Sequence, residues 1–138
     1  MQVRDQGNLV EALELLKKTG DRERAVRFLL QADIQDRMGK RDDAILALNQ
    51  AMAYGIPDPA FYVSLAEMGK KFQKNDIAIT ALQKASVFSG QSGEWHRTLQ
   101  KKFAELGAHR DASREQMTLR DIEKREKLAR EVDKKKAN

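Results

Sequence analysis

Side chains that catalyse reactions or bind metals are scarce in this chain of 138 residues, which has two histidines and no cysteine. The absence of cysteine excludes a disulfide scaffold, a cysteine nucleophile and a thiolate metal site. His96 and His109 lie thirteen positions apart without carboxylates at metal-site spacing, so we interpret each as an isolated surface or core histidine. No glycine-flanked serine resembles a nucleophile elbow. The sequence therefore predicts a protein without enzymatic activity, cofactor or metal.

A polar segment at residues 89–93, Ser-Gly-Gln-Ser-Gly, stands directly before a predicted helix. The N-terminus of a helix can hold an anion through its free backbone N–H groups. This segment lacks the lysine and the spacing of a phosphate loop, and it follows a helix instead of a strand. We therefore interpret it as a flexible turn between helices.

The charge balance argues against a nucleic-acid-binding surface. The chain carries 26 basic and 21 acidic residues, a net charge of +5. From Arg110 to the C-terminus, ten basic residues are interleaved with seven acidic ones, and this segment has no aromatic residue for base stacking. A stripe that neutralises phosphates is not evident, so weak nucleic-acid binding through the basic C-terminal helix is kept only as an alternative.

The composition predicts an all-α fold. Of the residues 41% are apolar, 34% are charged and only 6% are aromatic, and there are two prolines. These proportions, with abundant Ala, Leu, Lys, Glu and Arg, favour helices. No apolar stretch approaches the roughly 18 residues of a membrane span, and the polar first residues do not resemble a secretory signal. We expect no membrane insertion and favour a cytoplasmic location, or a periplasmic one if the chain is a fragment of a longer protein.

An internal repeat becomes visible when the sequence is aligned with itself at an offset of 34 positions. The aligned identical residues are mostly small or apolar and have helical spacing. They are Ala32 and Ala66, Lys40 and Lys74, Asp42 and Asp76, Ala44 and Ala78, Ile45 and Ile79, Ala47 and Ala81, Leu48 and Leu82, and Ala51 and Ala85. Chance alignment of two alanine-rich helices would not favour one offset so consistently.

The positions of these alanines have a physical reason. Ala44 and Ala51 lie seven positions apart, so they share one helix face, and Leu48 lies between them on that face. Alanine lets a neighbouring helix approach closely, while larger side chains fill the space beside it. A single helical hairpin cannot bury its apolar face alone, so we expect the units to stack.

The repeat resembles the tetratricopeptide repeat, a helix-turn-helix unit with this same period. The matching large and small residues are Phe28, Ala32, Ala44, Leu48 and Ala51 in a unit at about 25–58, and Tyr62, Leu65, Ala66, Ala78, Leu82 and Ala85 in a unit at about 59–92. A weaker third unit runs from 93 to 112 and onward, with Trp95 or His96 at its large position. A half unit at 7–20 precedes the others.

This resemblance implies an all-α, right-handed α-solenoid of antiparallel helix pairs, with a repeat domain at 1–112. We expect helices at 8–18, 22–38, 42–54, 59–73, 76–88, 93–106 and 109–134. Predicted N-caps are Asp21, Asp58, Ser92 and either Asn75 or Asp76, and Gly39, Gly55 and Gly107 are predicted to end helices in the left-handed conformation. The charged residues 113–138 are predicted to form a capping helix with a frayed tail, with a coiled-coil or partner-docking segment as the alternative.

The resemblance also implies a function, because partner peptides of such repeats usually bind a concave surface lined by the first helix of each pair. The residues expected there are Asp33, Asp36, Arg37, Val63, Glu67, Lys70, Lys71, Arg97 and Lys101. The basic group Lys70, Lys71, Arg97 and Lys101 would bind an acidic segment of a partner. Leu29, Asp33 and Ser64 replace the lysine and asparagines of members that bind chaperone tails, so that role is disfavoured.

The leading hypothesis is therefore a non-catalytic scaffold or adaptor that holds a peptide segment of a partner protein. A self-assembling structural protein is the alternative from a different class. The half unit lacks a partner helix, so Leu13 and Leu16 would be exposed unless a second copy of the chain covered them.

Overall fold

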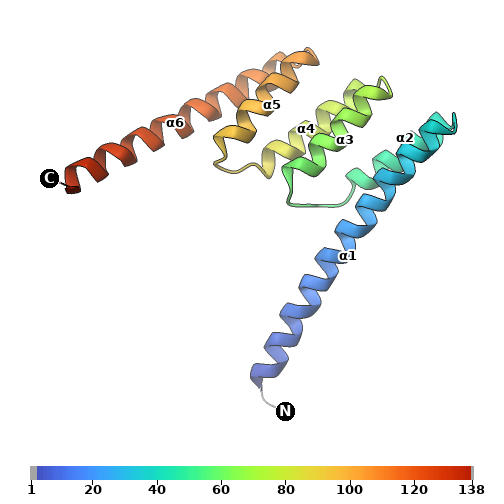
Figure 1. Cartoon of the computed structure of the whole chain (residues 1–138), viewed down its shortest axis with the longest axis horizontal. Coiled ribbons are helices and arrows are strands. Elements are labelled where there is room, and N and C mark those ends of the chain that lie inside the picture. Colours follow the sequence, from blue (N-terminus) through green and yellow to red (C-terminus); the bar gives the residue numbers. More distant parts are fainter. Residues whose placement is uncertain (1–2, 138) are drawn as a thin grey trace. The chain divides into compact units, whose positions relative to one another are not determined.

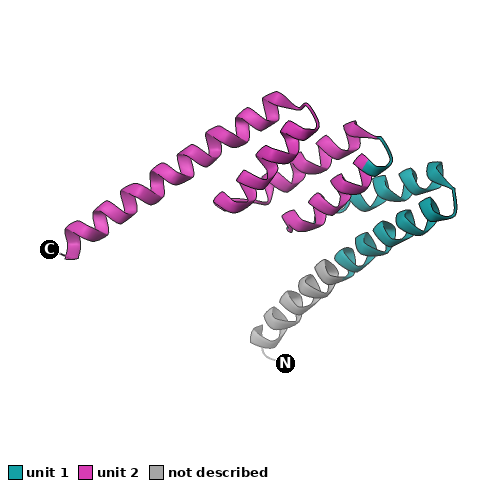
Figure 2. Ribbon diagram, turned by 45° about the horizontal axis from the view of Figure 1, so that its top comes forward, with its two compact units in different colours: residues 1–57, 71–73 teal, residues 58–70, 74–138 magenta. Residues whose placement is uncertain are grey.

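The computed structural model describes the backbone of residues 3–137 and the side chains of residues 20–137. Within that part the chain is entirely helical: α1 (Val3–Arg37), α2 (Arg41–Met52), α3 (Pro59–Lys71), α4 (Asn75–Val87), α5 (Gly93–Glu105) and α6 (His109–Ala137) (Figure 1). The helices belong to two compact units (Figure 2). Unit 1 contains α1, α2 and residues 71–73, and unit 2 contains residues 58–70 and everything from Lys74 onward. The predicted all-α fold is confirmed.

The repeat period is present in the geometry of the turns. Three residues with positive φ stand one period apart: Gly39 (76°), Gln73 (59°) and Gly107 (75°). Each turn is closed by the same backbone hydrogen bond, to a carbonyl five positions earlier: Lys40 to Gln35 (2.8 Å), Lys74 to Gly69 (2.8 Å) and Ala108 to Phe103 (2.9 Å). A left-handed residue followed by this bond is the common way to satisfy the last carbonyls of a helix. The arrangement is consistent with a helical repeat.

Small residues of the repeat form the core of each unit. Ala44 and Ala51 of unit 1 and Ala78 and Ala85 of unit 2 have no exposed surface. The close approach that they permit is visible at Gly69 of α3, where an added Cβ would lie 3.1 Å from the backbone nitrogen of Ala78. These alanines are therefore core residues, as the repeat pattern predicts.

One aromatic pair recurs in both units. In unit 1 the rings of Phe28 and Tyr54 stack with centroids 6.2 Å apart. In unit 2 the rings of Tyr62 and Phe88 stack at 5.6 Å. Each member of the second pair stands one repeat period after its counterpart in the first. Each pair joins the first helix of a hairpin to the end of the second.

Helix starts agree with the prediction in two places. The Asp58 carboxylate accepts a hydrogen bond from the backbone N–H of Ala60 (3.0 Å), at the beginning of α3. The Ser92 hydroxyl accepts one from the N–H of Trp95 (3.2 Å), at the beginning of α5. These two caps also stand one repeat period apart, which makes Arg24 their counterpart in the preceding unit.

The predicted break between helices at 8–18 and 22–38 is wrong. The two expected helices are parts of α1, which is continuous from Val3 to Arg37, so Asp21 lies inside a helix and is not an N-cap. The physical reason is that no proline interrupts the expected break, and its one glycine, Gly20, keeps a helical conformation instead of a left-handed one. The half unit at 7–20 and its residues Leu13 and Leu16 lie almost entirely outside the residues whose side chains the structure describes.

Two smaller predictions about helix ends are also wrong. The N-cap of α4 is Lys74, without a side-chain hydrogen bond, and not Asn75 or Asp76. Gly55 does not adopt the left-handed conformation, because the chain after α2 continues through a short loop to the Asp58 cap. Gly39 and Gly107 do adopt it, as predicted.

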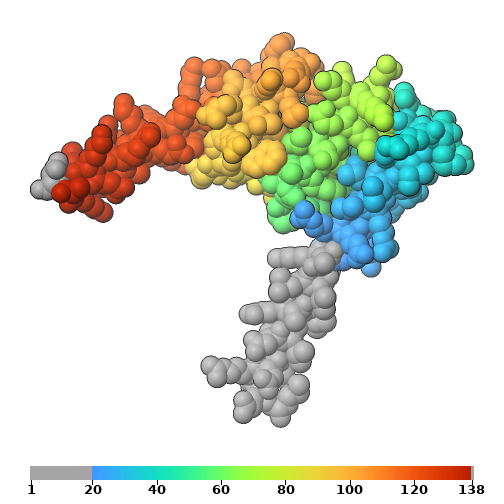
Figure 3. Space-filling model, viewed as in Figure 1, coloured from blue at the N-terminus to red at the C-terminus, as the bar shows by residue number. Residues whose placement is uncertain are grey.

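The last helix packs through its first half only. Glu115, Leu119 and Ile122 of α6 are buried, and α6 packs against α5. Every residue from Glu123 to Ala137 is exposed, and this part of α6 extends beyond α5 (Figure 3). The charged helix predicted from residue 113 onward continues a helix that begins at His109, and it remains helical to Ala137, so the predicted fraying of its end is not seen in the described residues.

Candidate functional site

In unit 1, four of the predicted groove residues form an ion cluster with Arg41. Asp33 pairs with Arg37 (3.1 Å) and with Lys71 (3.9 Å). Asp36, whose side chain is only 11% exposed, pairs with Lys71 (3.4 Å) and with Arg41 (3.3 Å). The Arg41 guanidinium also lies 5.7 Å from the ring centroid of Phe72. The two carboxylates therefore face cations of their own chain.

In unit 2, the predicted groove residues of α3 contact α5. The Lys102 ammonium donates to Glu67 (2.6 Å), and Lys70 pairs with Glu105 (3.9 Å). These four side chains border a small cavity together with Ala66, Leu82 and Leu106. Lys102 and Glu105 were not among the predicted site residues. Each follows its partner by one repeat period plus one residue, so the period could have indicated this contact between α3 and α5.

The remaining predicted residues lie on neighbouring positions of the same two helices. Val63 of α3 is half-buried. Arg97 of α5 is 64% exposed and lies 3.7 Å from Glu123 of α6. Lys101 is exposed. Of the predicted site residues in unit 2, Glu67 and Lys70 thus contact α5, whereas Arg97 contacts α6.

The chemistry of this surface is that of exchangeable ion pairs. Lys70 and Glu105 are each about half exposed, and pairs of this kind contribute only about 0–1 kcal/mol because water and salt screen them. A carboxylate from a ligand could therefore replace an internal partner at small cost. The buried carboxylate of Asp36 is different, because removing its cations would leave a charge with little contact to water.

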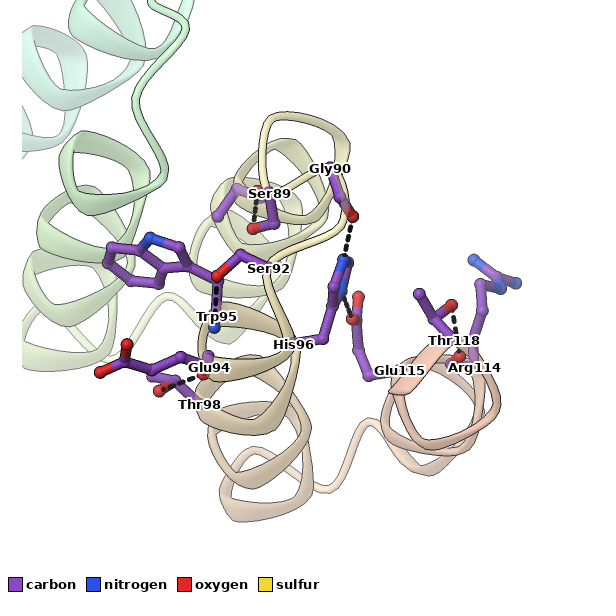
Figure 4. Close-up of polar contacts among 11 residues, drawn as sticks. Ser89, Gly90, Ser92, Glu94, Trp95, His96, Thr98, Arg114, Glu115 and Thr118 are labelled. Carbon is purple, nitrogen blue, oxygen red and sulfur yellow. Dashed lines mark hydrogen bonds and ion pairs between the residues drawn. The ribbon is translucent and has the colours of Figure 1, made fainter. Parts of the chain in front are cut away.

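A second polar cluster, which sequence reasoning missed, lies between α5 and α6 (Figure 4). The side chains of His96 and Glu115 are each only 4% exposed, and His96 Nδ1 lies 2.5 Å from a Glu115 carboxylate oxygen. His96 Nε2 lies 2.7 Å from the carbonyl oxygen of Gly90. His96 is thus a core histidine, but it has a carboxylate partner and is not isolated.

The hydrogen-bond geometry of this cluster orients the imidazole of His96. Its Nε2 faces the carbonyl oxygen of Gly90, which only accepts, so this nitrogen donates. Its Nδ1 faces a carboxylate oxygen of Glu115. Because both side chains are buried, this arrangement joins α5 to α6 and to the turn before α5.

The repeat period explains where this cluster stands. His96 occupies the position of Phe28 and Tyr62, and Glu115 occupies that of Ala47 and Ala81. The third hairpin thus replaces an aromatic side chain and a small one by a hydrogen-bonded pair. This substitution is the signal in the sequence that could have identified the pair.

The segment 89–93 is an ordered turn. The Ser89 hydroxyl donates to the carbonyl of Ala85 (2.7 Å) and is buried. Gly90 has a positive φ of 53° and orients its carbonyl toward His96, while Ser92 caps α5. The polar groups of this turn are therefore used to connect α4, α5 and α6.

Searches with protein-family models, curated proteins and solved structures found no match to this chain. The assignment of a repeat rests on its own residues and packing. Among the residues that the structure describes, no three His, Cys, Asp or Glu side chains are grouped so that they could hold a metal ion. Within the same part, no helix is long and apolar enough to cross a membrane.

Proposed function

We propose that the chain is a non-catalytic scaffold of the tetratricopeptide type, a right-handed solenoid that holds a peptide segment of a partner protein. The single observation that carries this proposal is the pairing of first helices in unit 2. Glu67 and Lys70 of α3 contact Lys102 and Glu105 of α5, so two first helices lie side by side. The surface of these helices is where repeats of this type bind peptides.

The charge of this surface favours an acidic peptide. Lys101 and Arg97 are exposed cations on one face of α5, and Lys70 is an exposed cation on α3. A peptide carboxylate that reached Lys70 would replace Glu105, a partner 3.9 Å away. In unit 1, Asp33, Asp36, Arg37 and Lys71 are engaged with one another, and their role in the proposal is to stabilise the hairpin.

An array of acidic and basic peptides, with binding measured by fluorescence anisotropy, tests the proposal. The variant Lys70→Glu/Lys101→Glu should lose binding of the acidic peptides. Lys127→Glu/Lys134→Glu makes the same change of charge on the exposed end of α6, and it should retain that binding. Equal affinity in the two variants would exclude α3 and α5 as the binding surface.

A further inference from the structure

Four large apolar side chains form an exposed ridge along α1 and its end. Val26, Leu30, Ile34 and Met38 follow one another at intervals of four positions and are 37%, 57%, 57% and 62% exposed. We call these four residues the α1 ridge. Ala25 and Ala32 of the same helix are fully buried, and α1 packs against α2. Side chains at this four-position interval form the ridges with which helices most often pack against one another.

The face of α5 at the same repeat positions as the α1 ridge shows which elements this face of a first helix contacts. Thr98, Lys102 and Leu106 stand two repeat periods after Leu30, Ile34 and Met38. Lys102 reaches Glu67 of α3, and Leu106 borders the same small cavity as Leu82 of α4. This face of a first helix thus packs against a neighbouring helix pair. On α1 the face is more apolar, yet it is exposed.

A second copy of the chain could cover the ridge in two ways, by a head-to-tail contact or with its own α1 ridge. The charges of the chain favour the second way. A head-to-tail contact would bring exposed polar residues of the last hairpin, such as Gln116 and Arg120, onto the ridge. That contact would desolvate cations against apolar side chains, which is unfavourable. The α1 ridge of a second copy is apolar, so it brings no charged side chain of its own onto the ridge.

The charged residues beside the ridge permit this second contact. Between Gly20 and Arg37, four acidic residues balance four arginines, so two copies of this segment do not repel each other. Two of the arginines are already paired within the helix, Arg27 with Glu23 (3.1 Å) and Arg37 with Asp33 (3.1 Å).

We propose that the α1 ridge binds the α1 ridge of a second copy, and that the two copies are related by a two-fold axis. The same patch then serves both copies, as in most protein dimers. Ridges with a four-position interval interlock when the helices cross at about −50°. Four side chains per copy make a small interface, so the dimer dissociates on dilution. This proposal is independent of peptide binding by α3 and α5.

Sedimentation velocity of the full chain over a wide concentration series tests the dimer. The wild-type chain should change reversibly between monomer and dimer. Leu30→Glu/Ile34→Glu should weaken dimerisation at least tenfold, with an unchanged circular dichroism spectrum and melting temperature. Leu46→Glu/Val87→Glu is the matched control, because these apolar side chains are 60% and 76% exposed on α2 and α4, and it should dimerise like the wild type.

A second measurement does not depend on ridge variants. Because the chain has no cysteine, Gln31→Cys carries a single nitroxide label beside the ridge. Two labelled copies should give a discrete intermolecular distance, which the Leu30→Glu/Ile34→Glu background should abolish. A chain that is monomeric at every concentration, or one that grows beyond the dimer as a head-to-tail contact would, overturns the proposal.

Discussion

His96 and Glu115 form a buried hydrogen-bonded pair at the two positions where the other hairpins have an aromatic residue and an alanine. In the first hairpin these positions hold Phe28 and Ala47, and in the second they hold Tyr62 and Ala81. The pair connects α5 to α6. Two hairpins thus have an aromatic residue and an alanine at these positions, and the third has a hydrogen-bonded pair.

This relationship predicts strong coupling between the two positions. Glu115→Ala alone leaves a buried imidazole nitrogen without a partner and should lower the free energy of unfolding by about 2–4 kcal/mol. His96→Phe alone leaves a buried carboxylate and should have a similar effect. The double variant His96→Phe/Glu115→Ala restores the residues of the first hairpin and should recover most of the loss. Urea denaturation of the four proteins measures the coupling, and simple addition of the two single effects would contradict it.

The close packing of α3 on α4 predicts that enlarging small residues there causes strain. Gly69→Ala places a Cβ 3.1 Å from the backbone nitrogen of Ala78, so the start of α4 must shift by a few tenths of an ångström, and this strain should cancel the roughly 0.5–1 kcal/mol that alanine gains over glycine in a helix. Ala78→Leu should lower the melting temperature through the same kind of strain. Gly55→Ala is the control, because its Cβ would meet no atom within 4 Å. An unchanged melting curve for Ala78→Leu would argue against the repeat frame.

The turn residues with positive φ predict that the protein is more stable with glycine than with glutamine at these positions. Gln73 adopts a φ of 59°, which an L-residue with a Cβ adopts at a cost. Gln73→Gly should therefore stabilise the protein by about 0.5–1 kcal/mol, despite the greater freedom of glycine when unfolded. The reverse change at the equivalent turn, Gly107→Gln, should destabilise it by a similar amount. Thermal denaturation of both variants checks the prediction, and shifts of the same sign would contradict it.

The continuity of α1 predicts the effect of a substitution at Gly20. Gly20 lies inside α1, and an added Cβ would meet no atom within 4 Å. Gly20→Ala should therefore increase helix content and stabilise the chain by about 0.5–1 kcal/mol. A helix break at this position, as the sequence suggests, would instead make the substitution neutral or unfavourable. Circular dichroism and amide hydrogen exchange of residues 15–25 distinguish the two outcomes.

The sequence alone determined the helical class, the repeat period and the residues that pack most closely. These properties are local or periodic: Ala44 and Ala78 recur at one offset, and Asp58 and Ser92 can cap the helices that follow them. The peptide-binding surface expected on α3 and α5 stays a prediction.

Only the tertiary structure decided how the charged and polar residues are paired. Glu67 meets Lys102 of the next first helix, and Asp36 meets Lys71 at the same separation along the chain. No sequence pattern distinguishes a charged side chain that pairs within the chain from one that binds a ligand. Opposite charges attract each other wherever the fold brings them together, whatever their separation along the chain. The continuity of α1 was equally hidden, since a helix ends only when a cap or a competing contact makes ending favourable. At Gly20 neither a proline nor a left-handed residue ends the helix.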